Sequence, residues 1–190
     1  MRQLRRGLRA ARYFWHRLRS CLVLLWYKSL YANLEIGNGV TVDRGVKLVV
    51  SSDGFLRIGD GTHIEGNCQL HAKGGRLSIG PRSFIGAGTI VVACSQITIG
   101  EDALISAYVT IRDQDHGFAQ NSISYSLQPL TIAPVIIGTN VWLGTHVTVL
   151  KGVTIGSGCV VAANSVVTRE LPPCVLSAGV PAVLVRSLRD

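Results

Sequence analysis

Residues 135–168 read VIIGTNVWLGTHVTVLKGVTIGSGCVVAANSVVT and decide the fold, because an aliphatic residue returns at every sixth position. The same period runs through most of the chain before this stretch. The residues on the repeat position are Ile36, Val42, Leu48, Ile58, Ile64, Leu70, Ile79, Ile85, Val91, Ile99, Ile105, Ile111, Ile137, Leu143, Val149, Ile155, Val161 and Val167. Glycine often follows the aliphatic residue, which predicts short strands joined by tight turns.

The length of the repeat indicates how the chain winds. A step of six residues is too short for a strand and a reversal of direction, so each step predicts one side and one corner of a coil. Three steps close a triangular coil of about 18 residues, and stacked coils share one continuous core. Where extra residues occur, they follow the third step of a coil, between Leu48 and Ile58, Leu70 and Ile79, Val91 and Ile99, and Ile111 and Ile137. All insertions are therefore expected at one corner of the prism.

The longest interruption is VTIRDQDHGFAQNSISYSLQPLTIAP at residues 109–134, which predicts an inserted loop at about 112–135. A loop of this size without regular structure is usually functional. It carries His116, a side chain whose ordinary pKa suits a general base near neutral pH. Asp113 and Asp115 are neighbouring carboxylates, and either is a candidate to fix the tautomer of the imidazole.

Charge is concentrated at the start of the chain. Of 19 Lys and Arg residues in the 190-residue chain, eight lie in residues 1–30, which contain no acidic residue. The remainder carries eleven basic and eleven acidic side chains and is neutral. A neutral body does not continue a basic surface, so a nucleic-acid partner is not expected.

Residues 1–32 are predicted to form a basic amphipathic helix, followed by a single β domain at 33–190. Apolar residues recur in steps of three and four at Leu4, Leu8, Ala11, Trp15, Leu18, Leu22 and Leu25. The favoured interpretation is a helix at the surface of a membrane, with residues 1–30 as the contact. A helix packed on the body or on symmetry mates ranks second, a signal peptide third and nucleic acid fourth. The apolar run from Cys21 to Tyr27 is shorter than the roughly 20 residues that span a bilayer.

Five scattered cysteines lack the spacing of a disulfide framework or a zinc site. The positions are Cys21, Cys68, Cys94, Cys159 and Cys174. A reducing cytoplasm is the expected compartment, and no metal is expected.

Several motifs resemble the hexapeptide-repeat sugar O-acetyltransferases, which include maltose and galactoside acetyltransferases. The strongest matches are VWLG at 141–144, NSVVT at 164–168 and GVPA at 179–182. DQDHGF at 113–118 and QPLTIAPVIIG at 128–138 are most similar to the branch that acts on capsule, lipopolysaccharide and exopolysaccharide. The resemblance covers residues 36–186. It implies an all-β left-handed parallel β-helix of hexapeptide repeats, to which the residue pattern adds the N-terminal amphipathic helix and the one long inserted loop.

The resemblance also implies an activity. Aligned on VTI at 109–111, His116 matches the catalytic histidine of the family, and Gln114 replaces a second histidine of the branch. The implied reaction transfers acetyl from acetyl-CoA to a sugar hydroxyl of a surface polysaccharide or its lipid-linked precursor. The residues that the resemblance places beside the cofactor are Trp142, Thr145, Ala163, Thr168, Arg169 and Arg186.

The family further implies a homotrimer with sites between subunits. The expected location is cytoplasmic, peripheral to the inner face of the plasma membrane. Two other functions stay open, namely a non-catalytic β-helix scaffold or binding module, and a γ-type carbonic anhydrase with three histidines on zinc. Trp142 is equally well explained as a filler of a subunit contact. His63, His71 and His146 are best explained as surface polar residues.

Overall fold

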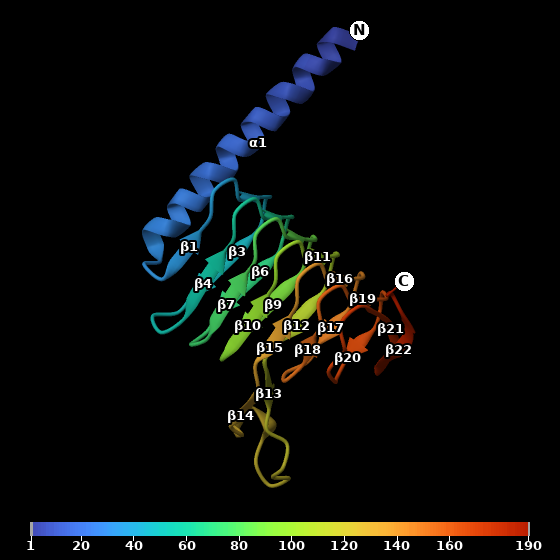
Figure 1. The fold of residues 1–190 in the computed structure, drawn as a ribbon. Coiled ribbons are helices and arrows are strands. Elements are labelled where there is room, and N and C mark those ends of the chain that lie inside the picture. Colours follow the sequence, from blue (N-terminus) through green and yellow to red (C-terminus); the bar gives the residue numbers. More distant parts are fainter. Residues whose placement is uncertain (1, 190) are drawn as a thin grey trace.

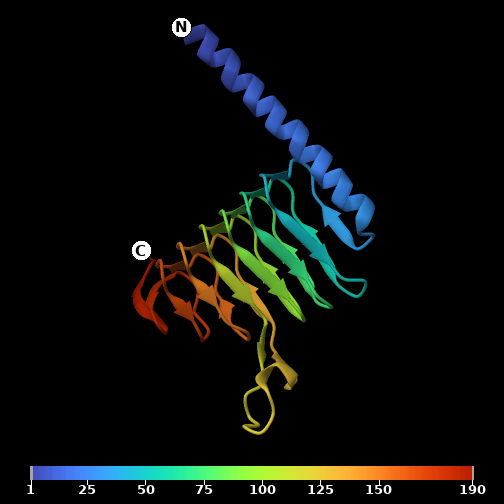
Figure 2. The same cartoon turned by 180° about the vertical axis from the view of Figure 1, so that it is seen from behind.

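The computed structural model describes the backbone of residues 2–189 and the side chains of residues 15–189. One helix, α1 (Arg2–Leu30), leads into a stack of short parallel strands from which one hairpin projects (Figure 1). Seen from behind, the stack advances coil by coil from the strands beside α1 to the C-terminal strands (Figure 2). The predicted all-β solenoid of hexapeptide repeats with one N-terminal helix is confirmed.

Three sheets, here named A, B and C, form the faces of the solenoid. Each of the first six coils adds one parallel strand to each sheet, and sheet B ends with two further strands, the last of them antiparallel. Sheet A contains β1 (Leu34–Ile36), β4 (Phe55–Ile58), β7 (Arg76–Ile79), β10 (Gln96–Ile99), β15 (Val135–Ile137) and β18 (Thr154–Ile155). Sheet B contains β2 (Thr41–Val42), β5 (His63–Ile64), β8 (Phe84–Ile85), β11 (Leu104–Ile105), β16 (Trp142–Leu143), β19 (Val160–Val161), β21 (Val175–Gly179) and β22 (Ala182–Ser187). Sheet C contains β3 (Lys47–Val50), β6 (Gln69–Ala72), β9 (Ile90–Ala93), β12 (Thr110–Arg112), β17 (Thr148–Val149) and β20 (Val166–Val167). The corners between consecutive sheets are called A–B, B–C and C–A below.

The core is the column of aliphatic residues on the repeat position. Ile58, Ile79 and Ile99 lie in register in adjacent coils and are almost fully buried. All the predicted repeat residues are buried except Ile36, which is only partly covered. Ile36 belongs to the first coil, where α1 replaces a preceding coil.

The glycines after the repeat residues allow close approach between coils, whereas the sequence predicts only that they form tight turns. A Cβ on Gly80 would lie 2.4 Å from the backbone nitrogen of Glu101 in the next coil, and one on Gly100 would lie 2.6 Å from the backbone of Gly138. Positive φ angles instead occur further along the turns, for example at Asn140 (51°) and His146 (60°). Glycine at these positions therefore permits the close spacing that the hydrogen bonds between coils require.

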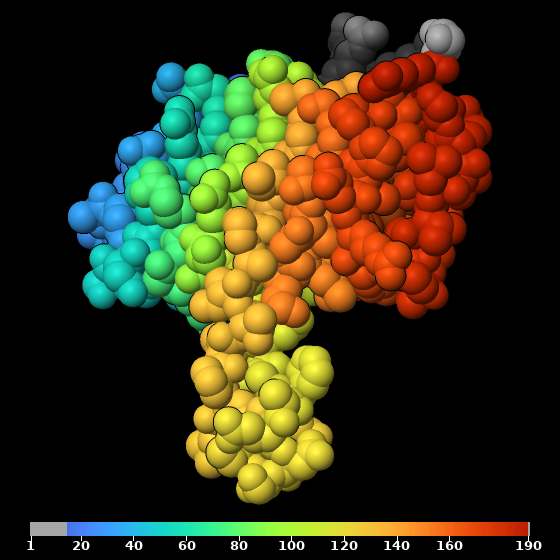
Figure 3. Space-filling model, turned by 60° about the horizontal axis from the view of Figure 1, so that its bottom comes forward, coloured from blue at the N-terminus to red at the C-terminus, as the bar shows by residue number. Residues whose placement is uncertain are grey.

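The long insertion leaves the C–A corner, as the sequence predicts, but it has regular structure. β13 (Gln114–His116) pairs antiparallel with β14 (Leu130–Ile132), and the short 3-10 helix η1 (Tyr125–Leu127) lies between them. Figure 3 shows this hairpin extending away from the solenoid. The expected unstructured loop at 112–135 is thus a β-hairpin with an irregular tip.

α1 covers the open edge of the first coil. Val42 donates its N–H to Ser20 Oγ at 2.8 Å, and its carbonyl accepts from Arg19 at 2.9 Å. Tyr27 donates to the carbonyl of Val46 at 3.1 Å. The first coil lacks a preceding coil to pair with, so these side chains satisfy backbone groups of an edge strand.

The described residues of the predicted apolar stripe are exposed, not buried against the body. Trp15 is 65% exposed, Leu22 59% and Leu25 57%, whereas Leu24 and Tyr27 are buried against the first coil. The stripe residues Leu4, Leu8 and Ala11 lie outside the described side chains. The second-ranked interpretation, packing on the body, therefore holds for the opposite face of the same helix. Within the described residues, no helix combines the length and apolar content needed to span a bilayer.

Candidate active site

His116 lies at the base of the projecting hairpin, at the end of β13. Its register partner in β14 is Leu130, and Gln114 pairs with Ile132. Side chains alternate along a strand, so His116 and Gln114 share one face of the hairpin and Asp115 lies on the other. The His116 side chain is exposed.

Asp113 fixes the base of the hairpin to the solenoid. It is fully buried, and its carboxylate accepts the backbone N–H groups of Cys94 (2.8 and 3.1 Å) and Ser95 (2.7 Å). The N–H of Ala133 donates to its backbone carbonyl at 2.9 Å, which ties the returning strand to the same point. Burial and the nearby Asp113 charge raise the pKa of the Cys94 thiol.

Asp115 forms an ion pair with Lys151 at 2.5 Å, across to the next coil. Both candidate carboxylates thus have other partners. Among residues 15–189, no hydrogen bond links either of them to the His116 ring. Asp115 points to the opposite face of the hairpin and Asp113 is held by the preceding coil, so within one chain the structure brings neither carboxylate to the imidazole.

Gln114, which stands where the resembling branch has a second histidine, lies two residues from His116 on β13. Its Oε1 is buried and has no hydrogen-bond partner among the described residues. An unpaired buried oxygen costs about 1–3 kcal/mol, so such atoms usually have a partner in the working protein. The i, i+2 spacing of Gln114 and His116 was the available signal in the sequence.

A second buried polar atom without a partner among these residues is Nε2 of His71. His71 stands on sheet C in the register row that continues through Val92 to Arg112, which directly precedes the hairpin. Burial, followed by the charges of Lys73, Arg112 and Lys47, lowers the pKa of His71. His71 is therefore only partly a surface residue.

The candidate cofactor residues lie on the last coils of the solenoid, at the B–C and C–A corners and on sheet B. Trp142 stands on the outer side of sheet B, 47% exposed, and donates its indole N–H to Ser106 at 3.2 Å. Thr145 and Ala163 occupy the B–C corner one coil apart, where the N–H of Asn164 donates to the carbonyl of Thr145 at 2.9 Å. Thr168 and Arg169 follow β20 at the end of sheet C and are exposed.

Arg186 lies in β22 and pairs with Leu176, in the register row that leads through Val160 to Trp142. Its side chain is exposed. Sheet B is the face opposite the C–A corner from which the hairpin leaves. One chain therefore brings Trp142 and Arg186 onto one face but does not bring them to His116.

The B–C corner also carries an aromatic pair that the sequence did not suggest. The rings of Tyr108 and His146 stack with centroids 5.1 Å apart and an interplanar angle of 9°. Tyr108 is 56% exposed, beside the coils that hold Thr145 and Ala163. Among the described residues, no group of three or more His, Cys, Asp or Glu side chains is arranged to hold a metal ion.

Fold and repeat define the class of protein. The pattern of the hexapeptide repeat of succinyl-transferase matches residues 76–112 and 134–169, on either side of the hairpin. The chain belongs to the hexapeptide-repeat family.

Within the hexapeptide-repeat family, the chain is similar in sequence to an O-acetyltransferase. Galactoside O-acetyltransferase of Escherichia coli K12 is 33% identical over 140 residues, which are 72% of this chain and 66% of the relative. The first curated relatives are matched over 53–66% of their length.

Solved structures that resemble this chain are also acetyltransferases. A hexapeptide-repeat-containing acetyltransferase from Vibrio cholerae, complexed with acetyl coenzyme A, is 30% identical with a TM-score of 0.58, over 77% of this chain and 73% of that one. The polySia-specific acetyltransferase NeuO is 27% identical with a TM-score of 0.56, over 83% of this chain and 88% of that one.

Proposed function

We propose that this protein is an acetyl-CoA-dependent O-acetyltransferase that modifies a sugar hydroxyl of a surface polysaccharide or its lipid-linked precursor. The observation that carries the proposal is the placement of an exposed histidine on an anchored hairpin of a hexapeptide-repeat solenoid. The acetyl-CoA complex of the Vibrio cholerae relative supports the donor, and the polySia specificity of NeuO supports a glycan acceptor.

His116 is the general base of the proposed reaction. Its neutral imidazole removes the proton of the acceptor hydroxyl as the oxygen attacks the thioester carbonyl. The tetrahedral intermediate then collapses, the carbon–sulfur bond breaks, and the imidazolium returns its proton to the thiolate of coenzyme A. The products are the acetyl ester and free coenzyme A, and no acyl-enzyme forms. Gln114 lies on the same face of the hairpin as His116 and borders the acceptor.

The site is completed between copies of the chain in a homotrimer. This assignment follows from the distance in the fold between the hairpin at the C–A corner and Trp142 on the opposite face. The hairpin also exposes large apolar side chains, with Phe118 75%, Tyr125 62% and Leu127 77% exposed. A cyclic trimer buries such a hairpin against a neighbour and places its histidine beside the neighbour's last coils.

Coenzyme A binds along those coils. Trp142 packs on the pantetheine arm, Thr145, Ala163 and Thr168 border it, and Arg169 and Arg186 bind its phosphates. A matching location is the cytoplasmic side of the plasma membrane. The exposed apolar stripe of α1 and the excess of basic residues in 1–30 provide the contact with the bilayer surface.

The test is acetyl transfer by the purified chain from acetyl-CoA to oligosaccharides of bacterial surface glycans, with release of free thiol as the readout. His116→Ala should lower kcat by at least 100-fold while the acetyl-CoA-dependent rise in thermal midpoint persists. His63→Ala is the matched control, because His63 lies in β5 of the second coil and its Nδ1 is occupied by Thr41 at 2.8 Å. If the wild-type chain binds no acyl-CoA, that result would favour the scaffold function instead.

A further inference from the structure

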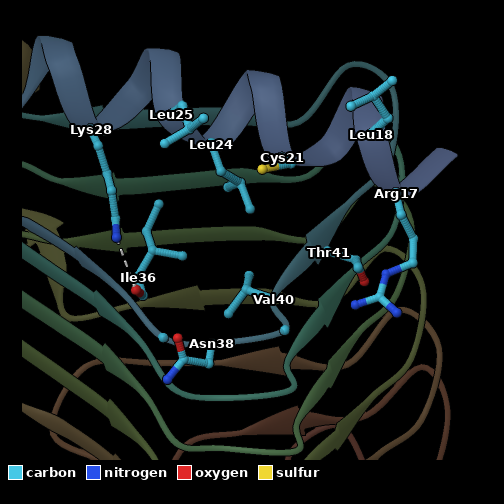
Figure 4. A pocket seen from close by; sticks show the side chains of 12 residues that line it. Arg17, Leu18, Cys21, Leu24, Leu25, Lys28, Ile36, Asn38, Val40 and Thr41 are labelled. Atoms are coloured by element: carbon cyan, nitrogen blue, oxygen red, sulfur yellow. Dashed lines mark hydrogen bonds between the residues drawn. The ribbon is translucent and has the colours of Figure 1, made fainter. Parts of the chain in front are cut away.

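A groove of about 640 Å³ lies between α1 and the A–B corner of the first coil. Figure 4 shows Leu18, Cys21, Leu24 and Leu25 of the helix on one side and Ile36 and Val40 of the coil facing them. Further lining residues of the coil are Gly37, Asn38, Gly39 and Thr41. The groove exists because Ile36, the repeat residue that is only partly covered, has no preceding coil above it.

Each end of the groove carries a basic side chain. Arg17 and Lys28 line it at opposite ends (Figure 4), and Lys28 also donates to the carbonyl of Ile36 at 3.2 Å. The two positions are eleven residues apart on α1, which is about 16 Å along a helix. Among the side chains that the structure describes, none that lines the groove is acidic. The groove is thus complementary to a long apolar chain with an anionic end.

The groove opens beside the outward apolar stripe of α1. Leu18 and Leu25 belong to both surfaces, at 39% and 57% exposure, and Leu22 extends the stripe away from the body. A helix that lies in a bilayer surface on this stripe brings the groove to the depth of the lipid headgroups and upper chains. The occupant with the matching chemistry is therefore a lipid of that bilayer.

We propose that this groove binds the hydrocarbon chain of a phosphate-bearing membrane lipid, with Arg17 or Lys28 at the phosphate. The proposal rests on the membrane association proposed above, and it does not depend on acetyl transfer. Lipid binding at α1 holds the solenoid at the membrane in one orientation. It makes lipid-linked acceptors, which carry the same phosphate and chain chemistry, local to the enzyme.

The experiment measures binding of octyl, decyl and dodecyl phosphate to the full chain by calorimetry, below the concentrations at which the amphiphiles form micelles. Each pair of added methylenes should tighten binding about 15-fold, the ratio that about 0.8 kcal/mol per methylene gives. Dodecyltrimethylammonium, with the same chain and the opposite charge, should bind at least tenfold more weakly than dodecyl phosphate. Inorganic phosphate should not compete. Equal binding of the two dodecyl compounds, or no dependence on chain length, would overturn the proposal.

A pair of neighbouring substitutions locates the site. Cys21→Trp places an indole inside the groove and should abolish dodecyl phosphate binding, whereas Leu22→Asn changes the outer stripe and should leave it unchanged. Leu22→Asn should instead weaken flotation with vesicles that contain phosphatidic acid. If Cys21→Trp fails to fold, alkylation of the native Cys21 thiol replaces it, because Cys21 is exposed. Dodecyl phosphate should slow that alkylation at least tenfold, and an unchanged rate rejects the proposal.

Two further outcomes separate the remaining explanations. A change of oligomeric state on Cys21→Trp, with no binding of any alkyl phosphate by the wild type, would assign the groove to a second copy of the chain and overturn the proposal. Alkyl phosphate binding by a protein that releases no thiol from acetyl-CoA would support the lipid site while refuting the proposed enzyme. The lipid-binding proposal and the proposed acetyltransferase activity can therefore be refuted independently.

Discussion

Replacement of Asp113 by Asn tests whether the hairpin base is fixed by one buried carboxylate. Two oxygens of Asp113 accept three contacts from the N–H groups of Cys94 and Ser95, at 2.7–3.1 Å. Hydrogen bonds to a charged group contribute about 1.5–3 kcal/mol each. The amide keeps one accepting oxygen and turns an NH₂ group toward a backbone donor. We expect a loss of about 3 kcal/mol in the free energy of unfolding, or about 6–12 °C in thermal midpoint for a chain of this length.

The same substitution should reduce activity through position rather than chemistry. A displacement of about 1 Å in a reacting group lowers rates by as much as about 100-fold. Asp113→Asn should therefore lower kcat by about 10- to 100-fold, with KM for acetyl-CoA nearly unchanged. The assay pairs calorimetry with steady-state acetyl transfer.

Asp115→Asn is the matched control, because it removes the same charge two residues along the chain. The carboxylate of Asp115 is 41% exposed and pairs with Lys151 near the surface, so its loss should cost about 0–1 kcal/mol. If Asp113→Asn and Asp115→Asn lower stability and kcat equally, the anchoring role of Asp113 is refuted.

Three further predictions concern the coils and the hairpin face. Gly80→Ala should destabilise the protein by about 3 kcal/mol or more in chemical unfolding, because its Cβ would lie 2.4 Å from the backbone of Glu101; a loss below 1 kcal/mol would contradict the coil-spacing argument. The pKa of His71 is lowered in the folded state, so the unfolded chain binds more protons than the folded chain as pH falls below about 6.5. The free energy of unfolding should therefore decline from pH 7 to pH 5. His71→Gln should make that decline smaller, as measured by thermal unfolding at each pH. Gln114→Leu removes an unpaired buried oxygen, so it should leave stability unchanged or about 1 kcal/mol higher while raising KM for the acceptor; a loss of stability with normal KM would make Gln114 structural.

Much of the fold could be predicted because its determinants are local and repeated. Each six-residue step carries its own aliphatic residue, and Ile58, Ile79 and Ile99 meet only because equal steps are stacked. The corner at which the insertion leaves the solenoid could be predicted by counting six-residue steps. The hairpin inside the insertion could not be predicted, because Gln114 pairs with Ile132 across an irregular tip whose sequence has no repeating pattern.

The site was harder to predict, since its partners are distant in sequence. Asp113 stands three residues before His116, which suggested a triad-like pair, yet its partners are the N–H groups of Cys94 and Ser95 in the preceding coil. Backbone donors carry no signature in the sequence. The alternation that separates Asp115 from His116 also appears only once residues 114–116 are known to form a strand.

The helix shows how one amphipathic pattern serves two surfaces. Terminal caps of repeat proteins ordinarily cover the core with one face and present a polar outer face to solvent. α1 reverses this arrangement: Ser20 and Tyr27 bond the exposed backbone of the first coil, while Trp15, Leu22 and Leu25 face outward at 57–65% exposure. Capping alone does not require that outer stripe, and a contiguous exposed apolar surface favours contact with a membrane or another protein. The bonds of Ser20 and Tyr27 and the outward stripe can be tested separately, since Leu22→Asn should leave the thermal midpoint unchanged and Ser20→Ala should lower it, by about 1–3 kcal/mol in stability, without affecting vesicle binding.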